Sequence, residues 1–328
     1  MRIGVLGLGV VGQRLIELLD DDSVSTPVVV TGRVHKDREA LRRIHRDHVE
    51  LVEFRIEADA TFDVDVVVLA SPDEHHATAA SAALAGGAHV VSLADSAATV
   101  TELLSLNEFA REVGRSVVVG AAASPGVSTL LAIHAGTLFS RIDQVDIAVT
   151  GTAGPACIDR RARANRTETQ EWRDAMWVDC GARSAPELVF FPDPVGSIEC
   201  ARGDLSESLV LRRVMPNVDL LSIKVAKEPV SPVQRAGRRS RRPEREIEPG
   251  AQRIMVSGEI DGVPETVVYG LVASTRDISA DLAQLCAWAA LSEQRSGAMT
   301  VGELVDAPST LRMLADRGSQ MLVYEDLD

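Results

Sequence analysis

The sequence predicts an α/β protein in which a doubly wound parallel sheet is followed by an α+β part with a mainly antiparallel sheet. From residue 1 to about 135, short β-branched strand patterns alternate with helical patterns, as in parallel sheets covered by helices on both faces. A glycine-rich turn opens this alternation, and beyond Arg141 the alternation stops. We expect three segments: a first domain at 1–135, an α+β domain at 136–275, and helices at 276–328 that pack back toward the first domain.

The first element is an apolar strand at 2–6 that runs into a glycine turn and then into a helix. Gly7, Gly9 and Gly12 have GxGxxG spacing, and a helical apolar period continues to Leu19. Gly7 permits the tight turn, Gly9 leaves room for a ligand beside the backbone, and Gly12 lets helix and strand pack closely. This is the pyrophosphate-binding turn of a Rossmann-type dinucleotide fold, and the helix start supplies free N–H groups. The expected contacts are Gly7, Gly9, Val10, Val11 and Gly12.

The end of the second predicted strand, at 27–31, distinguishes the two nicotinamide dinucleotides. Enzymes that select NAD usually carry Asp or Glu there, about 20 residues after the glycine turn, to bind the ribose 2′-hydroxyl. This chain has Thr31 and Arg33 instead, followed by a basic helical pattern. Because a guanidinium can bind a 2′-phosphate through paired hydrogen bonds, we expect NADP rather than NAD. The alternative is that Arg33 only begins a solvated basic helix.

The strand ends of the first domain supply the remaining expected contacts, because ligands of open parallel sheets bind outside the carboxyl ends of the strands. Ser71, Pro72 and His75 would lie beside a ribose. Pro125 suits the first position of a helix, so free amides at Ser124 and beyond would face a carboxylate or the nicotinamide carboxamide. The elements expected between these segments are strands at 64–70, 88–93 and 116–119 and helices at 77–85 and 100–113.

Proton transfer accompanies hydride transfer, and a few residues near these strand ends could carry the proton. A histidine titrates nearest to neutral pH, and burial can raise the pKa of an aspartate toward it. Asp95 stands at a strand end, although an aspartate there could instead cap the next helix. His76 and its neighbour His75 are expected to point in different directions, so at most one faces the site. His134 is a further candidate, about two helical turns after Pro125.

The second part of the chain offers contacts for a substrate. Trp172 and Arg173 could form an apolar wall with a carboxylate clamp, and the alternative is a half-buried element with surface ions. The run Arg160-Arg161-x-Arg163 is a second basic group. Six arginines between Arg235 and Arg245 predict an exposed basic loop, or else a flap over the cofactor. Antiparallel strands are expected at 142–150, 187–191, 218–225, 253–260 and 265–272, and a helix at 279–291.

Composition narrows the function classes. The chain has 328 residues and a formal net charge of −14, which argues against nucleic acid or an anionic membrane as a partner. The sequence shows no signal-peptide pattern and no long apolar run, so we expect a cytoplasmic protein. The four cysteines include no CxxC pair, so neither a metal site nor a disulfide framework is expected.

With these segments in view, the chain resembles the saccharopine dehydrogenase-like NAD(P) oxidoreductases. The resemblance lies in the glycine turn with Thr31-Gly32-Arg33, in residues 66–72 and 87–95, and in residues 120–127. It implies a Rossmann first domain, an NAD(P) cofactor and often a dimer. Sugar and inositol dehydrogenases of the Gfo/Idh/MocA type share the first domain but usually carry a catalytic Glu-Lys-Pro lysine. This chain has Ser92-Leu93-Ala94-Asp95 at that place, so that family ranks second.

The predicted function is that of an NADP-dependent oxidoreductase. It would move a hydride to or from a small carbonyl, imine or amino-acid-like substrate bound between the domains, and the expected assembly is a homodimer. Two alternatives stay open. One is a Gfo/Idh/MocA-like dehydrogenase without the usual lysine, and the other is a sensor or regulatory protein that binds NADP without catalysis.

Overall fold

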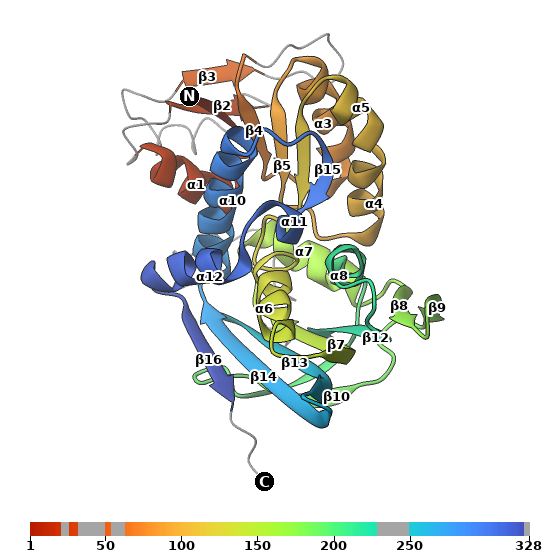
Figure 1. Ribbon diagram of the computed structural model, residues 1–328. Coiled ribbons are helices and arrows are strands. Elements are labelled where there is room, and N and C mark those ends of the chain that lie inside the picture. Colours follow the sequence, from red (N-terminus) through yellow and green to blue (C-terminus); the bar gives the residue numbers. More distant parts are fainter. Residues whose placement is uncertain (21–25, 32–49, 54–62, 228–248, 325–328) are drawn as a thin grey trace.

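The computed structural model describes residues 1–20, 26–31, 50–53, 63–227 and 249–324, which form two sheets with helices packed on them (Figure 1). The predicted fold class is confirmed. In the first sheet seven described strands run parallel in the order β15-β6-β5-β4-β1-β2-β3. Their bounds are β1 Arg2–Leu6, β2 Thr26–Thr31, β3 Glu50–Glu53, β4 Val66–Leu69, β5 His89–Ser92, β6 Ser116–Val119 and β15 Gly297–Thr300.

Alternate residues of these strands face two different helix layers. Val66, Val68 and Val118 pack in one core cluster with helices α1 (Val10–Asp20) and α10 (Thr275–Ser292). Val67 and Val117 pack in another cluster with α3 (His76–Ala85), α4 (Ala97–Ser105) and α5 (Asn107–Glu112). The strands are therefore buried on both faces, which explains their continuous β-branched sequence.

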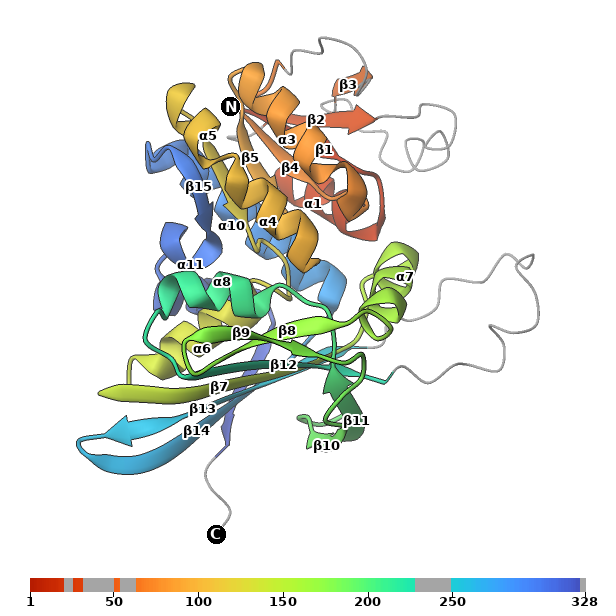
Figure 2. The same cartoon turned by 90° about the vertical axis from the view of Figure 1, so that its right-hand side faces the viewer.

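The second sheet has nine described strands and lies below the first domain in Figure 2. Its main path is β10-β11-β12-β7-β13-β14-β16, with the hairpin β8–β9 attached to β12. Helices α6 (Val127–Gly136) and α8 (Glu207–Val214) cover one face of it. The bounds are β7 Arg141–Thr150, β8 Thr169–Arg173, β9 Met176–Cys180, β10 Glu187–Phe190, β11 Ser197–Arg202, β12 Leu220–Ala226, β13 Gly250–Ile260, β14 Val263–Ala273 and β16 Gln320–Tyr324.

Two strand and helix predictions were wrong in detail. Strands β7 and β12 were expected to be antiparallel like the rest, but they pair in parallel because the chain between them crosses over through α7 (Pro155–Ala164) and α8. The single helix expected at 100–113 is two helices, α4 and α5, with a break at Leu106.

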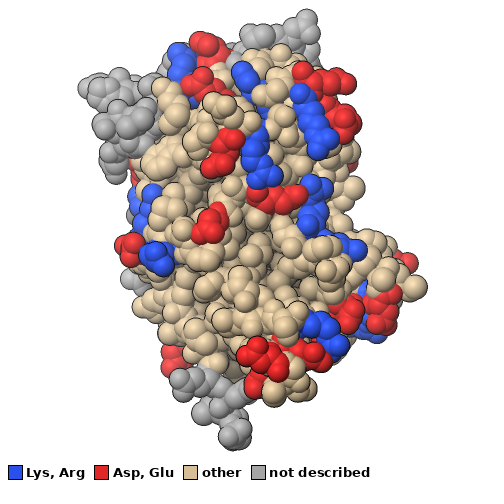
Figure 3. Space-filling model, in the orientation of Figure 1, with Lys and Arg blue, Asp and Glu red and all other residues tan. Residues whose placement is uncertain are grey.

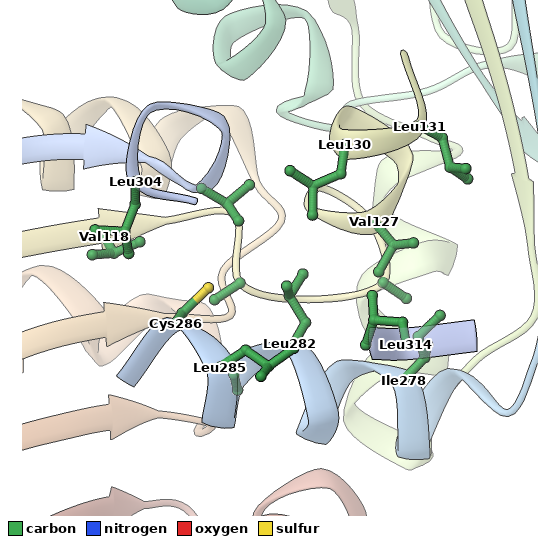
Figure 4. Close-up of a cluster of buried hydrophobic side chains, with 14 of the residues drawn as sticks. Val118, Val127, Leu130, Leu131, Ile278, Leu282, Leu285, Cys286, Leu304 and Leu314 are labelled. Atoms are coloured by element: carbon green, nitrogen blue, oxygen red, sulfur yellow. The ribbon is translucent and has the colours of Figure 1, made fainter. Parts of the chain in front are cut away.

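The segment from Thr275 onward packs against both sheets. Helix α10 lies against α1, β4 and β5, and β15 adds a strand beside β6, whereas α12 (Ala307–Asp316) packs on α6 and β16 pairs with β14. Figure 4 shows the resulting shared core, in which Leu282 and Ile278 of α10 lie near Val127 of α6. Leu304, from the short helix α11 (Val301–Leu304), closes the same core. One continuous core therefore connects the two sheets.

The start of α6 differs from the sequence prediction. Pro125 was expected at the first helical position, but the helix begins at Val127. Gly126 precedes it with a φ of 147°, and a Cβ there would lie 2.1 Å from the carbonyl oxygen of Ala122. Only glycine fits this backbone, so the helix starts after it and Pro125 belongs to the preceding loop.

Among the described residues, no helix combines the length and the apolar character that crossing a bilayer requires. On the face drawn in Figure 3, acidic and basic side chains are interspersed rather than gathered into one basic area.

Candidate active site

The glycine turn has the geometry that a dinucleotide pyrophosphate requires. Gly7 has a φ of 111°, which favours glycine, and a Cβ on Gly12 would lie 1.9 Å from the carbonyl oxygen of Gly7. A Cβ on Gly9 would meet no atom within 4 Å, so the backbone at Gly9 faces open space. The turn therefore leaves room at Gly9 for a phosphate while helix and strand are in contact at Gly12, and these residues fit the cofactor.

A cavity of about 330 Å³ opens beside this turn. It lies at the carboxyl ends of β1, β4, β5 and β6, where the strand order of the first sheet reverses between β4 and β2 around β1, and α7 and the start of α10 complete its wall. This is the place where open α/β sheets bind ligands. The lining residues include Gly9, Val10, Val11, Ser71, Pro72, Asp73, Asp95, Ser124, Cys157, Arg160, Arg161, Thr275 and Ser279.

The cavity contains about half of the residues predicted from the sequence. Gly9, Val10, Val11, Ser71, Pro72, Asp95 and Ser124 line it, and Gly7 and Gly12 shape the turn beside it. His75 is exposed, and neither it nor Pro125 lines the cavity. Thr31 ends β2 as expected. Arg33 and the arginines between Arg235 and Arg245 lie outside the described residues.

Asp95 forms an ion pair with Arg160 of α7. Arg160 Nε lies 2.8 Å from Asp95 Oδ1 and 3.9 Å from Asp73 Oδ2, and Arg160 Nη2 lies 3.2 Å from Asp204 Oδ2. Three carboxylates thus surround one buried guanidinium. Arg160 therefore joins the end of β5 to the second part of the chain.

Asp95 does not cap the helix that follows it. The side chain of Ser96 accepts the hydrogen bond from the amide of Thr99 at the start of α4, so capping does not explain Asp95. Burial raises the pKa of Asp95, and the charges of Arg161 and Arg160 act in the opposite direction. A carboxyl group with a raised pKa at a cavity wall suits proton transfer near neutral pH.

Arg161 is a second buried cation of the site. It is only 5% exposed and lines the cavity, and its Nε and Nη1 atoms have no oxygen or nitrogen partner among the described residues. A buried guanidinium with unsatisfied donors calls for an acceptor. Arg161 can therefore bind a carboxylate, a carbonyl or another acceptor group of a ligand.

Ser124 is paired with a fully buried acid. Its Oγ donates a hydrogen bond to Oε1 of Glu207, the first residue of α8. Burial raises the pKa of Glu207, while the hydrogen bond from Ser124 and the charge of Arg161 act against that rise. Glu207 Oε2 has no hydrogen-bond partner among the described residues. This pair places a carboxyl group directly behind the cavity wall.

The predicted acid–base residues His76 and His134 are not brought to this cavity. His76 is fully buried with Nδ1 2.9 Å from Ser92 Oγ and Nε2 2.8 Å from the carbonyl oxygen of Ser71, and burial lowers its pKa. It holds the β4 and β5 ends together. His134 packs against the ring of Tyr269 at a centroid distance of 5.7 Å, on the α6 side of the second sheet.

The predicted substrate wall also lies elsewhere. Trp172 is buried in the β8–β9 hairpin, edge-on to Trp177 and beneath the guanidinium of Arg212, and its Nε1 donates to the carbonyl oxygen of Val218. Arg173 pairs with the buried Glu171. The structure matches the alternative of a structural element with ion pairs, because the partners of Trp172 and Arg173 come from their own sheet, from α8 and from the segment between α8 and β12.

Comparison with known proteins was made on sequence and on structure. Residues 2–116 match the family model described as semialdehyde dehydrogenase, NAD-binding domain. A search of curated proteins found no significant match to the sequence.

Solved structures with the same fold cover nearly the whole chain. Saccharopine dehydrogenase (L-Glu forming) from Saccharomyces cerevisiae superposes with a TM-score of 0.73 at 12% identity, over 99% of this chain and 100% of that one. DAP dehydrogenase of C. glutamicum, in complex with DAP, superposes with a TM-score of 0.54 at 15% identity, over 97% of this chain and 99% of that one. An engineered D-amino acid dehydrogenase bound to NADP+ superposes with a TM-score of 0.55 at 15% identity, over 97% of this chain and 99% of that one. The chain thus has an NAD(P)-binding, dehydrogenase-type fold, in which residues 2–116 match the semialdehyde dehydrogenase NAD-binding domain and the whole chain shares the fold of saccharopine dehydrogenase.

Proposed function

We propose that the protein is an NADP-dependent oxidoreductase that transfers a hydride to or from a small carbonyl, imine or amino-acid-like substrate in the cavity. One observation carries this proposal. A single cavity is lined by the glycine turn at Gly9, by the buried acid Asp95 and by the unsatisfied cation Arg161. A turn that can bind a dinucleotide, an acid that can carry a proton and a cation that can hold a substrate thus line the same cavity.

The dinucleotide would be held by the residues that fit it. The backbone from Gly9 to Val11 would receive the pyrophosphate, Ser71 and Pro72 would lie along a ribose, and Arg33 would bind the 2′-phosphate. When bound, the nicotinamide supplies or accepts the hydride. The structurally similar D-amino acid dehydrogenase that was solved with NADP+ supports the choice of cofactor.

The protein side of the reaction would use two charged residues. Asp95 would exchange a proton with the reacting oxygen or nitrogen of the substrate, since it alone among the predicted acid–base residues lines the cavity. Arg161 would orient the substrate through its unsatisfied N–H groups. The names of the similar structures, saccharopine, DAP and D-amino acid dehydrogenases, favour an amino-acid-like substrate.

The assembly we propose is a homodimer. Leu188 and Phe190 on β10 and Leu322 and Val323 on β16 are exposed apolar side chains of the second sheet. Sedimentation equilibrium would show a mass of twice the chain's 35.1 kDa if this proposal holds.

The first experiment is calorimetric titration of the protein with NADPH and NADH, followed by spectrophotometric assays of NADPH oxidation and NADP+ reduction with carbonyl, imine and amino-acid substrates. Tight NADPH binding, weak NADH binding and turnover of at least one substrate would support the proposal. Binding of neither dinucleotide would overturn it. NADPH binding without turnover of any substrate would favour a sensor.

A further inference from the structure

Ser124 occupies the part of the cavity that belongs to the nicotinamide half of a dinucleotide. In doubly wound sheets each half of the strand order binds one mononucleotide, and the pyrophosphate lies at the glycine turn between them. Here β2 and β3 lie on one side of β1, and the ribose-selective position at the end of β2 assigns the adenosine to that side. Ser124 follows β6 on the other side and lines the same cavity as Gly9.

The backbone that carries Ser124 is held from three directions. The amide of Ala123 donates to Oγ of Ser279 over 3.0 Å, and Nε2 of Gln252 donates to the carbonyl oxygen of Ala123 over 2.6 Å. The Gly126 turn, closed to any side chain, follows directly. Ser124 is 6% exposed, so its hydroxyl has a defined position on the cavity wall rather than a range of positions.

The polarity of the Ser124 hydroxyl is defined when Glu207 is ionised. A serine hydroxyl has one donor and two acceptor lone pairs, and here the donor is used by Glu207 Oε1. Glu207 is fully buried, so water does not compete for this bond. With Glu207 ionised, Ser124 can then offer only lone pairs toward the cavity. Its neighbour Arg161 has the opposite character, because a guanidinium offers only donors.

We propose that Ser124 accepts a hydrogen bond from the carboxamide amino group of the nicotinamide, and that Glu207 is the positioning residue that fixes Ser124 as an acceptor. The inference rests on the proposed dinucleotide site and adds a residue pair that selects the nicotinamide end. Neither side chain needs to move a proton for this role. The amino group of the carboxamide is the donor that the lone pairs of Ser124 would select.

The test compares the binding of three ligands by calorimetry, without turnover. They are NADP+, its 3-acetylpyridine analogue, which has a methyl group in place of the amino group, and 2′-phospho-ADP-ribose, which lacks the nicotinamide. We expect the wild type to bind NADP+ about tenfold more tightly than the analogue, as for one lost hydrogen bond in a buried site. Ser124→Ala should reduce this preference to about twofold or less and leave the affinity for 2′-phospho-ADP-ribose unchanged.

Two further variants sharpen the comparison. Glu207→Gln should lower the preference at least threefold, because a glutamine amide can donate to Ser124 and turn its hydroxyl proton toward the cavity. Ser128→Ala is the matched control: Ser128 is a buried serine four residues away on α6 that does not line the cavity, so its loss should leave the preference unchanged. Parallel titrations with NAD+, its acetylpyridine analogue and ADP-ribose make the test independent of the 2′-phosphate.

The outcomes separate this inference from the proposed function. Equal wild-type binding of dinucleotide and analogue, or a preference that survives in Ser124→Ala, would overturn the role of Ser124 while the dinucleotide site stands. A preference that survives only in Glu207→Gln would remove Glu207 from the proposal. Failure of the wild type to bind both dinucleotides and both ribose phosphates would overturn the proposed function, and this inference with it.

Discussion

Arg160 Nε lies 2.8 Å from Asp95 Oδ1, and this contact joins α7 to the carboxyl end of β5 across the cavity wall. The same Arg160 also contacts Asp73 and Asp204, whose carboxylates come from the segment after β4 and from the segment before α8. Arg160 thus forms ion pairs with three carboxylates of the protein, whereas the next residue, Arg161, lines the cavity and forms no ion pair within 4 Å among the described residues. Two adjacent arginines of one helix thus differ: Arg160 joins three segments of the site, and we propose that Arg161 binds a ligand.

The Asp95→Asn variant tests the proton carrier. Asparagine keeps the shape of the side chain but cannot exchange the proton, so we expect turnover to fall about 100-fold or more. The dissociation constant for NADPH should stay within about twofold, since Asp95 is not part of the glycine turn. Steady-state kinetics and calorimetry measure the two effects. The exposed Asp316→Asn is the control, and undiminished turnover of Asp95→Asn would assign the proton to another group.

The Arg33→Ala variant tests the choice of cofactor. Loss of a charge-assisted pair with the 2′-phosphate, about 1.5 to 3 kcal/mol, should weaken NADPH binding roughly tenfold or more. NADH lacks this phosphate and serves as the internal control, with an affinity that should hardly change. Equal losses for the two dinucleotides would show that Arg33 does not distinguish them.

The Glu207→Gln variant tests the buried acid through the pH dependence of stability. Burial raises the pKa of Glu207 above its ordinary value of 4.5, so the folded state holds this proton more tightly than the unfolded state. Its contribution to stability is complete below the ordinary value and is lost as pH rises through the raised pKa. Glutamine does not titrate, so the Tm of the variant minus that of the wild type should increase from pH 5 to pH 8. A constant difference would mean that the pKa of Glu207 is not raised.

Much of the fold could be predicted because its signals are local. The β-branched run ending at Leu69 and the spacing of Gly7, Gly9 and Gly12 each lie within a few neighbouring residues, and both were placed correctly. Strand direction in the second sheet was less predictable, because the pairing of β7 with β12 depends on the path of the chain between them. The strand β15, which pairs with β6, could not be predicted, because its four residues from Gly297 are too few to show a strand-type alternation of apolar and polar residues.

The site was only partly predictable because its chemistry depends on contacts between distant residues. Ser124 and Glu207 are 83 residues apart, and nothing near Glu207 marks it as more than a helix-starting acid. The run at Arg160 and Arg161 is visible in the sequence, but the sequence does not show which of the two arginines forms ion pairs with three carboxylates. His76, His134 and Trp172 are predicted from residue type and position along the chain, and packing within the two sheets places their side chains away from the cavity.

The two glycines Gly9 and Gly12 provide a matched pair for the cofactor turn. A Cβ at Gly9 would meet no protein atom within 4 Å, so Gly9→Ala should fold with a Tm within a few degrees of the wild type. It should nevertheless weaken NADPH binding about tenfold or more, because the methyl group would occupy the space of the pyrophosphate. A Cβ at Gly12 would lie 1.9 Å from the carbonyl oxygen of Gly7, so Gly12→Ala should lower the Tm as well as the affinity. Thermal unfolding and calorimetry on both variants separate the two roles, and unchanged NADPH affinity in Gly9→Ala would show that no phosphate lies against this turn.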